Sequence, residues 1–259
     1  VTAVLEEDRG RTTVVGGASA ADQKQRIANV RRLTQLGCDG VLVAVGYENE
    51  KQYRHTVEEL ADALEGVDVS TPDVVGKETA GDSRRQRPFL MIQDWDFSGF
   101  GAPVALIAGL FEDVPAFRSL KVEVVPAGVK YSQVLEATGD RLHVAGGWAV
   151  GQMIEGLDRG VHAFMPTGMH EIYCEIYRRY TAGDRGGAQA LFRELLPVLA
   201  FANQHLDISI HFFKRLLHAE GIYPTARVRE PILSFDEIHE QTAAELIELV
   251  GHLTRSVNA

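Results

Sequence analysis

The feature of this sequence that most limits its fold is the alternation of short β-branched or apolar runs with amphipathic stretches. Apolar runs of this length are typical of parallel strands that are buried on both faces. The predicted strands are residues 12–15, 40–45, 89–93, 120–124, 142–145 and 162–165. Because parallel strands need crossover connections, usually helices, the alternation predicts an α/β fold.

The amphipathic stretches between these strands have helical spacing. In the first of them Ile27, Val30 and Leu33 fall on one face, and Gly37 is a typical stop. The predicted helices are residues 20–36, 53–64, 103–111, 131–137 and 149–157, and after the last strand 169–180, 187–202, 208–219 and 235–253. Residues 67–87 are rich in Asp, Gly, Ser, Thr and Arg, which predicts a surface loop.

The number of strands separates two α/β architectures. A (β/α)8 barrel needs eight strands, and six are found. An open doubly wound sheet expects G-x-G-x-x-G after its first strand, and Gly16-Gly17 lacks that spacing. We interpret Gly16-Gly17 as a tight strand-to-helix turn, with Ser19 near the helix start. Residues 1–7 resemble the end of a helix, so we predict a (β/α)8 TIM barrel without its first two strands over 1–182, followed by a C-terminal helical layer over 183–259.

Composition excludes several classes of partner. The chain has 26 basic and 36 acidic residues and a formal charge of −10, which repels nucleic acid and anionic lipid. No apolar run approaches the roughly 20 residues of a membrane helix. Cys38 and Cys174 form no disulfide framework, which predicts a cytoplasmic protein. The nine histidines show no ligand spacing, so no metal is predicted.

One predicted strand carries two charges. Period-two alternation in residues 120–124 places Lys121 and Glu123 on one face and the aliphatic residues on the other. In a barrel the aliphatic face packs against helices, so the charged pair points inward. Removing water from a lysine favours its neutral amine, which can attack a ketone and form a Schiff base. The alternatives are an ion pair that only fills the barrel, or an edge strand in water.

Two stretches around this lysine, 114–123 and 139–147, resemble the dihydrodipicolinate synthase / N-acetylneuraminate lyase family of Schiff-base aldolases. Further similarities follow in the same order along the chain, at residues 10–17, 37–43, 88–93, 98–99, 212–214, 221–222 and 226–231. The resemblance implies a (β/α)8 barrel with a helical extension. It also implies that Lys121 forms the imine, that Glu123 is the acidic residue often found after it, and that no cofactor is needed.

Further site residues follow from this resemblance and from strand ends. Tyr47 matches a tyrosine that the family often places after its fourth strand, and Gln93 would bind substrate by hydrogen bonds. Gly146 and Gly147 would let substrate approach the backbone, and Met165 would offer its backbone carbonyl. The alternatives are that Tyr47 is an ordinary surface residue, that Gln93 is a hydrogen-bonded polar residue at the barrel mouth, and that Gly146-Gly147 form a plain turn.

The sequence also departs from the family pattern. Ile92 stands where the family's proton-relay tyrosine is expected, and the family's second-strand Gly-Thr/Ser-Thr-Gly-Glu motif is not found. Thr12-Thr13 are interpreted as ordinary strand residues. Lys130 is a rival lysine, but it is predicted at a helix start, exposed to solvent.

These observations predict a lyase or aldolase that acts on pyruvate or a sugar-derived 2-oxo acid by carbon–carbon cleavage, condensation or dehydration. The first alternative is a degenerate barrel that binds a 2-oxo acid or sugar acid as a sensor. The second is an open sheet that binds a nucleotide. The family resemblance also implies a homo-oligomer, either a dimer or a homotetramer.

Overall fold

The computed structural model describes residues 1–66, 88–96 and 98–258, so the loop predicted at 67–87 lies outside the described residues. The strands are β1 (Val15–Gly17), β2 (Gly40–Ala44), β3 (Phe89–Asp96), β4 (Phe117–Val124), β5 (His143–Gly146) and β6 (Ala163–Phe164). The helices are α1 (Thr2–Asp8), α2 (Gln23–Gln35), α3 (Glu50–Glu65), α4 (Val104–Asp113), α5 (Ala127–Thr138), the 3-10 helix η1 (Trp148–Gln152), α6 (Met153–Asp158), α7 (His170–Thr181), α8 (Arg185–Ala202), α9 (Leu206–Ala219) and α10 (Glu237–Val257).

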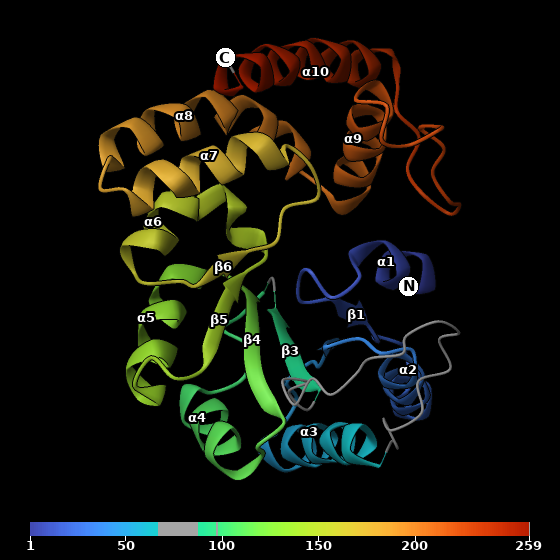
Figure 1. Cartoon of the computed structure of the whole chain (residues 1–259), viewed down its shortest axis with the longest axis vertical. Coiled ribbons are helices and arrows are strands. Elements are labelled where there is room, and N and C mark those ends of the chain that lie inside the picture. Colours follow the sequence, from blue (N-terminus) through green and yellow to red (C-terminus); the bar gives the residue numbers. More distant parts are fainter. Residues whose placement is uncertain (67–87, 97, 259) are drawn as a thin grey trace. The chain divides into compact units, whose positions relative to one another are not determined.

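The described strands form one parallel sheet in which the neighbours follow chain order from β1 to β6. Figure 1 shows α2 to α5 arranged around the outside of these strands. A doubly wound sheet reverses its strand order at a switch point, whereas consecutive units of a (β/α)8 barrel do not. The sheet is therefore a partial TIM barrel, which confirms the predicted fold class and excludes the doubly wound alternative.

The first strand begins later than predicted. Thr12 is not part of β1, because its amide and hydroxyl donate to Asp8 Oδ1 at 3.0 and 2.6 Å, within a turn. The strand instead contains Gly16, where an added Cβ would lie 2.8 Å from Leu33 Cδ2 of α2. The glycine pair thus allows a helix to pack closely on the strand. Ser19 does not start a helix either, since its Oγ accepts the amide of Ala44.

Polar residues fix the starts of two helices. Asp22 accepts the Gln25 amide at the start of α2, and Asn49 accepts the Gln52 amide at the start of α3. Such N-caps satisfy backbone donors that have no partner inside the helix. The helix predicted at 131–137 begins earlier, at Ala127. The helix therefore includes Lys130, whose side chain is buried.

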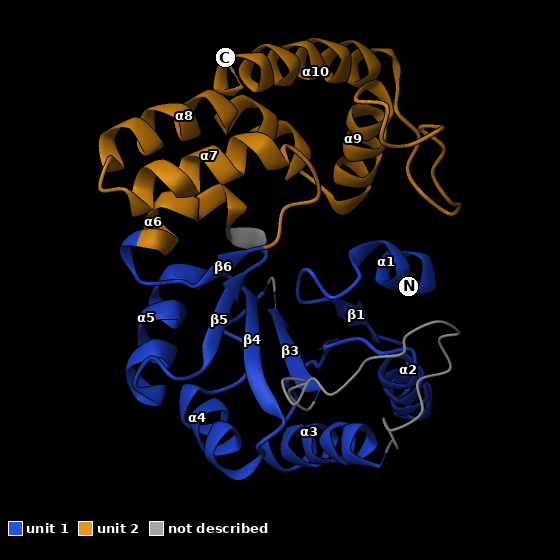
Figure 2. Cartoon of the chain, in the orientation of Figure 1, with its two compact units in different colours: residues 1–149, 158–164 blue, residues 150–157, 165–259 orange. Residues whose placement is uncertain are grey.

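The chain divides into two compact units, drawn in blue and orange in Figure 2. Unit 1 comprises Val1–Ala149 and Asp158–Phe164, and it contains all six strands. Unit 2 comprises Val150–Leu157 and Met165–Ala259. Helix α7, which was assigned to the barrel by the predicted boundary at residue 182, groups with α8 in unit 2. The predicted division of the chain at residue 182, between barrel and helical layer, stays a prediction.

Unit 1 has its apolar core on the outer face of the sheet. Leu90, Ile92, Leu120 and Val122 pack there against helical residues such as Leu60. Within unit 2, helices α7 to α10 enclose buried residues of their own, including Ile172, Leu195, Phe212 and Val250. None of the described helices is both long enough and apolar enough to cross a membrane.

Candidate active site

Strand β4 carries the predicted lysine and glutamate on the face opposite the apolar core. Leu120 and Val122 are fully buried in the core, while the side chains of Lys121 and Glu123 keep 14% and 13% exposure. Lys121 Nζ lies 2.9 Å from Glu123 Oε1. The alternation read from the sequence is therefore confirmed, and the two charges form an ion pair inside the partial barrel.

A residue of the neighbouring strand completes this cluster. Gln93 of β3 lies opposite Lys121 in the sheet register, so both side chains project from the same face. Its Nε2 donates to Glu123 Oε2, the carboxylate oxygen that Lys121 does not use. Glu123 is thereby held by a cation on one oxygen and an amide on the other, which fixes its orientation beside the amine.

Glycine at position 147 makes room for the ion pair. A Cβ on Gly147 would lie 1.9 Å from Glu123 Oε1 and 2.4 Å from Lys121 Cε. Contacts this short do not occur between real atoms, so any side chain there would displace the pair. Gly146, the last residue of β5, is buried and pairs with Val122. The turn after β5 therefore lies directly against Lys121 and Glu123, and its role in the approach of substrate stays a prediction.

Two other predicted residues do not join the cluster within unit 1. Tyr47 is 37% exposed beyond β2, and its ring packs edge-on against Tyr53 with centroids 5.9 Å apart. Among the described residues it has no hydrogen bond to Lys121, Glu123 or Gln93. Met165 follows β6 directly, is 38% exposed and belongs to unit 2. Roles for Tyr47 and Met165 stay predictions.

The position assigned to the missing tyrosine was wrong. Ile92 pairs with Leu120, is fully buried and belongs to the apolar core, so it faces the helices. A side chain at this position is directed away from Lys121. The inward positions of β3 are Met91, Gln93 and Trp95, of which Met91 is buried and Trp95 is 46% exposed. Trp95 was not among the predicted site residues, although its spacing of two from Gln93 places it on the same face of the strand.

The expectation for Lys130 was also wrong. Because α5 begins at Ala127, Lys130 lies on the helix face that is directed at the sheet, and its side chain is 0% exposed. Its Nζ lies 2.5 Å from Asp94 Oδ2 and donates to the carbonyl oxygens of Ala102, at 2.6 Å, and Phe100. Burial lowers the pKa of Lys130, and the Asp94 carboxylate opposes this shift. This ammonium is sealed inside the layer between sheet and helices.

No cluster of three or more His, Cys, Asp or Glu side chains suited to a metal ion exists in the part of the chain that the structure describes. The absence of a metal and of a cofactor remains an expectation of the sequence analysis. The polar groups next to Lys121 on the inner face are a carboxylate and an amide, and Ser119, which is hydrogen-bonded to His143, lies on the same face two residues earlier in β4. Such a set can bind a carbonyl compound, form an imine and move a proton between amine and carboxylate.

No protein-family model and no curated protein matches this sequence. Solved structures do match it. The 4-hydroxy-tetrahydrodipicolinate synthase of Methylacidiphilum fumariolicum superposes with a TM-score of 0.79 at 15% identity, covering 99% of this chain and 79% of that one. The chain has the fold of the dihydrodipicolinate synthases.

Two further dihydrodipicolinate synthases give the same result. The protein of Rhodopseudomonas palustris has a TM-score of 0.76 at 18% identity, covering 96% of this chain and 81% of that one. The protein of Thermotoga maritima has a TM-score of 0.75 at 15% identity, covering 99% and 79%. Both units therefore belong to the dihydrodipicolinate synthase fold. The resemblance found in the sequence is confirmed at the level of the fold.

Proposed function

We propose that this chain is a Schiff-base lyase or aldolase of the dihydrodipicolinate synthase type, acting on pyruvate or a sugar-derived 2-oxo acid. The observation that carries the proposal is the pairing of Lys121 with Glu123 on the inner face of β4, with Gln93 beside them. Lys121 is the only lysine on a described strand. The fold shared with the dihydrodipicolinate synthases supports the same assignment.

In the proposed reaction the neutral amine of Lys121 attacks the ketone carbon of the substrate. A C–N bond forms, the ketone oxygen takes up protons and leaves as water, and a protonated imine remains. Glu123, 2.9 Å from Nζ, is placed to take the proton that the ammonium must lose before it attacks. Gln93 cannot exchange a proton at neutral pH, so its role is to hold Glu123 and to orient the substrate.

The protonated imine then acts as an electron sink. Loss of a proton from the adjacent carbon gives an enamine, and this enamine supports carbon–carbon cleavage, condensation or dehydration according to the substrate. The charge that develops on nitrogen stays next to the Glu123 carboxylate, which stabilises it. All of these steps use groups of the chain and of the substrate.

Borohydride trapping tests this function directly. Full-length protein is incubated with pyruvate, or with a 2-oxo sugar acid, then reduced with borohydride and weighed as an intact chain. The proposal expects one reduced adduct per chain. Binding of either acid by calorimetry without any adduct would contradict the proposal and favour the sensor alternative.

Deuterium exchange gives a second readout that needs no knowledge of the aldehyde partner. An enamine of pyruvate exchanges its methyl protons with solvent, so in heavy water the methyl signal of pyruvate should decay in proportion to enzyme concentration. An adduct without this exchange would mean that the imine forms and no enamine follows, which would contradict the aldolase assignment.

The assembly of the chain is part of the proposal as well. Homo-oligomer formation, as a dimer or a tetramer, follows from the family resemblance. Light scattering at micromolar protein should give a multiple of the chain mass of 28.5 kDa. A mass of one chain under these conditions would show that the oligomer prediction is wrong, and it would leave the imine chemistry untouched.

A further inference from the structure

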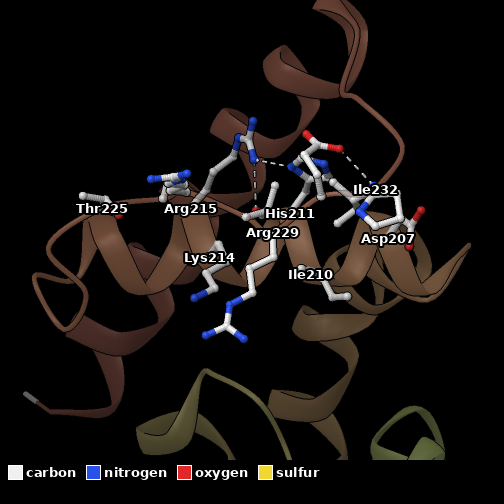
Figure 3. A pocket seen from close by; sticks show the side chains of 13 residues that line it. Asp207, Ile210, His211, Lys214, Arg215, Thr225, Arg229 and Ile232 are labelled. Carbon is white, nitrogen blue, oxygen red and sulfur yellow. Dashed lines mark hydrogen bonds between the residues drawn. The ribbon is translucent and has the colours of Figure 1, made fainter. Parts of the chain in front are cut away.

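Unit 2 contains a large open hollow outside the region discussed so far. Its volume is about 1240 Å³, and it is lined by α9 and by the irregular segment that covers residues 225–232 (Figure 3). A space of this size accommodates a small organic molecule. Every residue that lines it belongs to unit 2, so the hollow is a property of that unit.

The walls of the hollow carry cations that have no anionic partner among the described residues. Lys214, Arg227 and Arg229 make no hydrogen bond or ion pair with any residue that the structure describes; Lys214 Nζ lies 4.6 Å from the centre of the Tyr223 ring. Arg215 on the same wall is different, since it is paired with Glu240 and bonded to His211. Three cations of the hollow are therefore available to a ligand.

The two carboxylates of the lining are already engaged. Asp207 accepts the backbone amide of Leu233 at 3.0 Å, and Glu230 accepts that of Ile232 at 3.2 Å. Both hold the irregular segment in place. These bonds leave both carboxylates charged, but the lining holds four cations, Lys214, Arg215, Arg227 and Arg229, against the two carboxylates, so it keeps an excess of positive charge in a chain whose net charge is −10. A local field of opposite sign to the rest of the protein attracts small anions.

The geometry favours an anion with two charges. Figure 3 shows the charged ends of Lys214 and Arg229 reaching the same side of the hollow, one from α9 and the other from the irregular segment. A guanidinium offers a planar fork for two oxygens, and an ammonium adds a point charge. A monocarboxylate carries one negative charge, whereas two cations are matched in charge by an anion that carries two. The hydroxyl of Thr225, also in the lining, is a further donor for phosphate oxygens.

We propose that this hollow binds a phosphate-bearing small molecule through Lys214 and Arg229, with Arg227 adding to the attraction. The proposal is independent of imine chemistry at Lys121. A phosphate group could belong to a free metabolite or to a lipid headgroup, and both would use the same contacts. We infer the free molecule, because an overall charge of −10 repels an anionic membrane.

Calorimetry of the full chain with inorganic pyrophosphate tests the proposal. The double variant Lys214→Gln/Arg229→Gln should bind roughly 10- to 100-fold more weakly for each cation removed. Arg193→Gln is the matched control, because Arg193 is an exposed arginine of α8 outside the hollow. It should leave the affinity unchanged. Circular dichroism verifies that each variant is folded.

The remaining measurements separate the alternatives. Acetate at the same concentration should bind far more weakly than pyrophosphate, and vesicles that contain phosphatidic acid should not retain the protein at physiological salt. Equal loss of pyrophosphate affinity in the double variant and in Arg193→Gln would show that the overall charge of the protein, and not the hollow, determines binding. This result would overturn the proposal. Retention on the vesicles that is lost in the double variant would overturn the free-ligand assignment.

Discussion

Two lysine–carboxylate pairs lie on opposite faces of the same sheet, and they differ in access to solvent. On the inner face Lys121 pairs with Glu123, with side chains 14% and 13% exposed. On the outer face Lys130 of α5 pairs with Asp94 of β3, at 0% and 1% exposure. The inner amine is open to a substrate and has one carboxylate as partner. The outer one is saturated by a carboxylate and two backbone carbonyls.

In the proposed function, this difference separates the reactive lysine from a structural one. A nucleophilic amine needs space for the incoming ketone and a partner that can accept its proton. A buried ammonium with all its hydrogen bonds made is costly to disturb, because removal of one partner leaves an uncompensated charge. The inner pair should therefore control chemistry and the outer pair should control stability.

The largest expected effect is on chemistry, at the inner lysine. Replacement Lys121→Met removes the nucleophile and should slow deuterium exchange into pyruvate by roughly 10³-fold or more. Stability should fall less than in Lys130→Met, since the inner pair keeps some exposure and Glu123 retains its hydrogen bond from Gln93. NMR measures the exchange rate, and a denaturant titration measures the change in stability. If Lys121→Met still exchanges the protons at the parent rate, another lysine forms the imine and the assignment of Lys121 is wrong.

The next effect is on stability, at the outer lysine. Replacement Lys130→Met leaves the Asp94 carboxylate buried without its cation and should lower the free energy of unfolding by about 3–5 kcal/mol. The double variant Lys130→Met/Asp94→Leu removes both charges and should recover much of that loss. Urea titrations of the three proteins measure it. An unchanged unfolding midpoint for Lys130→Met would mean that the outer pair does not stabilise the fold.

A smaller effect is expected where the backbone touches the inner pair. Replacement Gly147→Ala forces Lys121 and Glu123 to move, and a displacement of this kind can cost up to about 10²-fold in rate. Gly17→Ala is the control, because an added Cβ there meets no atom within 4 Å. Both variants are compared by exchange rate. Equal rates in Gly147→Ala and the parent would show that the pair's position is not critical.

The smallest effect is expected at Gln93, whose amide is proposed to orient the substrate. Removing the amide in Gln93→Ala should raise KM for pyruvate by roughly tenfold and lower kcat of exchange by less, because the amide mainly contributes binding. Steady-state exchange kinetics over a range of pyruvate concentrations separate the two constants. An unchanged KM together with a large loss of kcat would show that Gln93 acts in the transition state.

Local patterns were sufficient for the inner face of the sheet. Alternation in residues 120–124 placed Lys121 and Glu123 together, and strand order followed from the repeated βα pattern. The same rule, applied one strand earlier, would have directed Ile92 outward and identified Trp95. The error at Ile92 arose because a family motif was aligned by position without its register against β4.

Contacts between distant segments were beyond the sequence. The partner of Lys130 is Asp94 on another element, and no local pattern connects them. The sequence placed Lys130 at a helix start, where a lysine is expected in water, and gave no sign that its side chain is directed at the sheet. Similarly, Asp8 draws Thr12 out of β1 although threonine favours strands. A contact with another element decided the first case, and a turn of only four residues overrode the strand preference in the second.

Identifying the reduced lysine tests the central claim most directly. After borohydride reduction with pyruvate, the protein is digested and the modified peptide is located by mass spectrometry. The account predicts that the label lies on Lys121, with Lys130 unmodified in the folded chain. A label on Lys130, or on Lys214 in unit 2, would contradict the assignment of the inner pair as the reactive one.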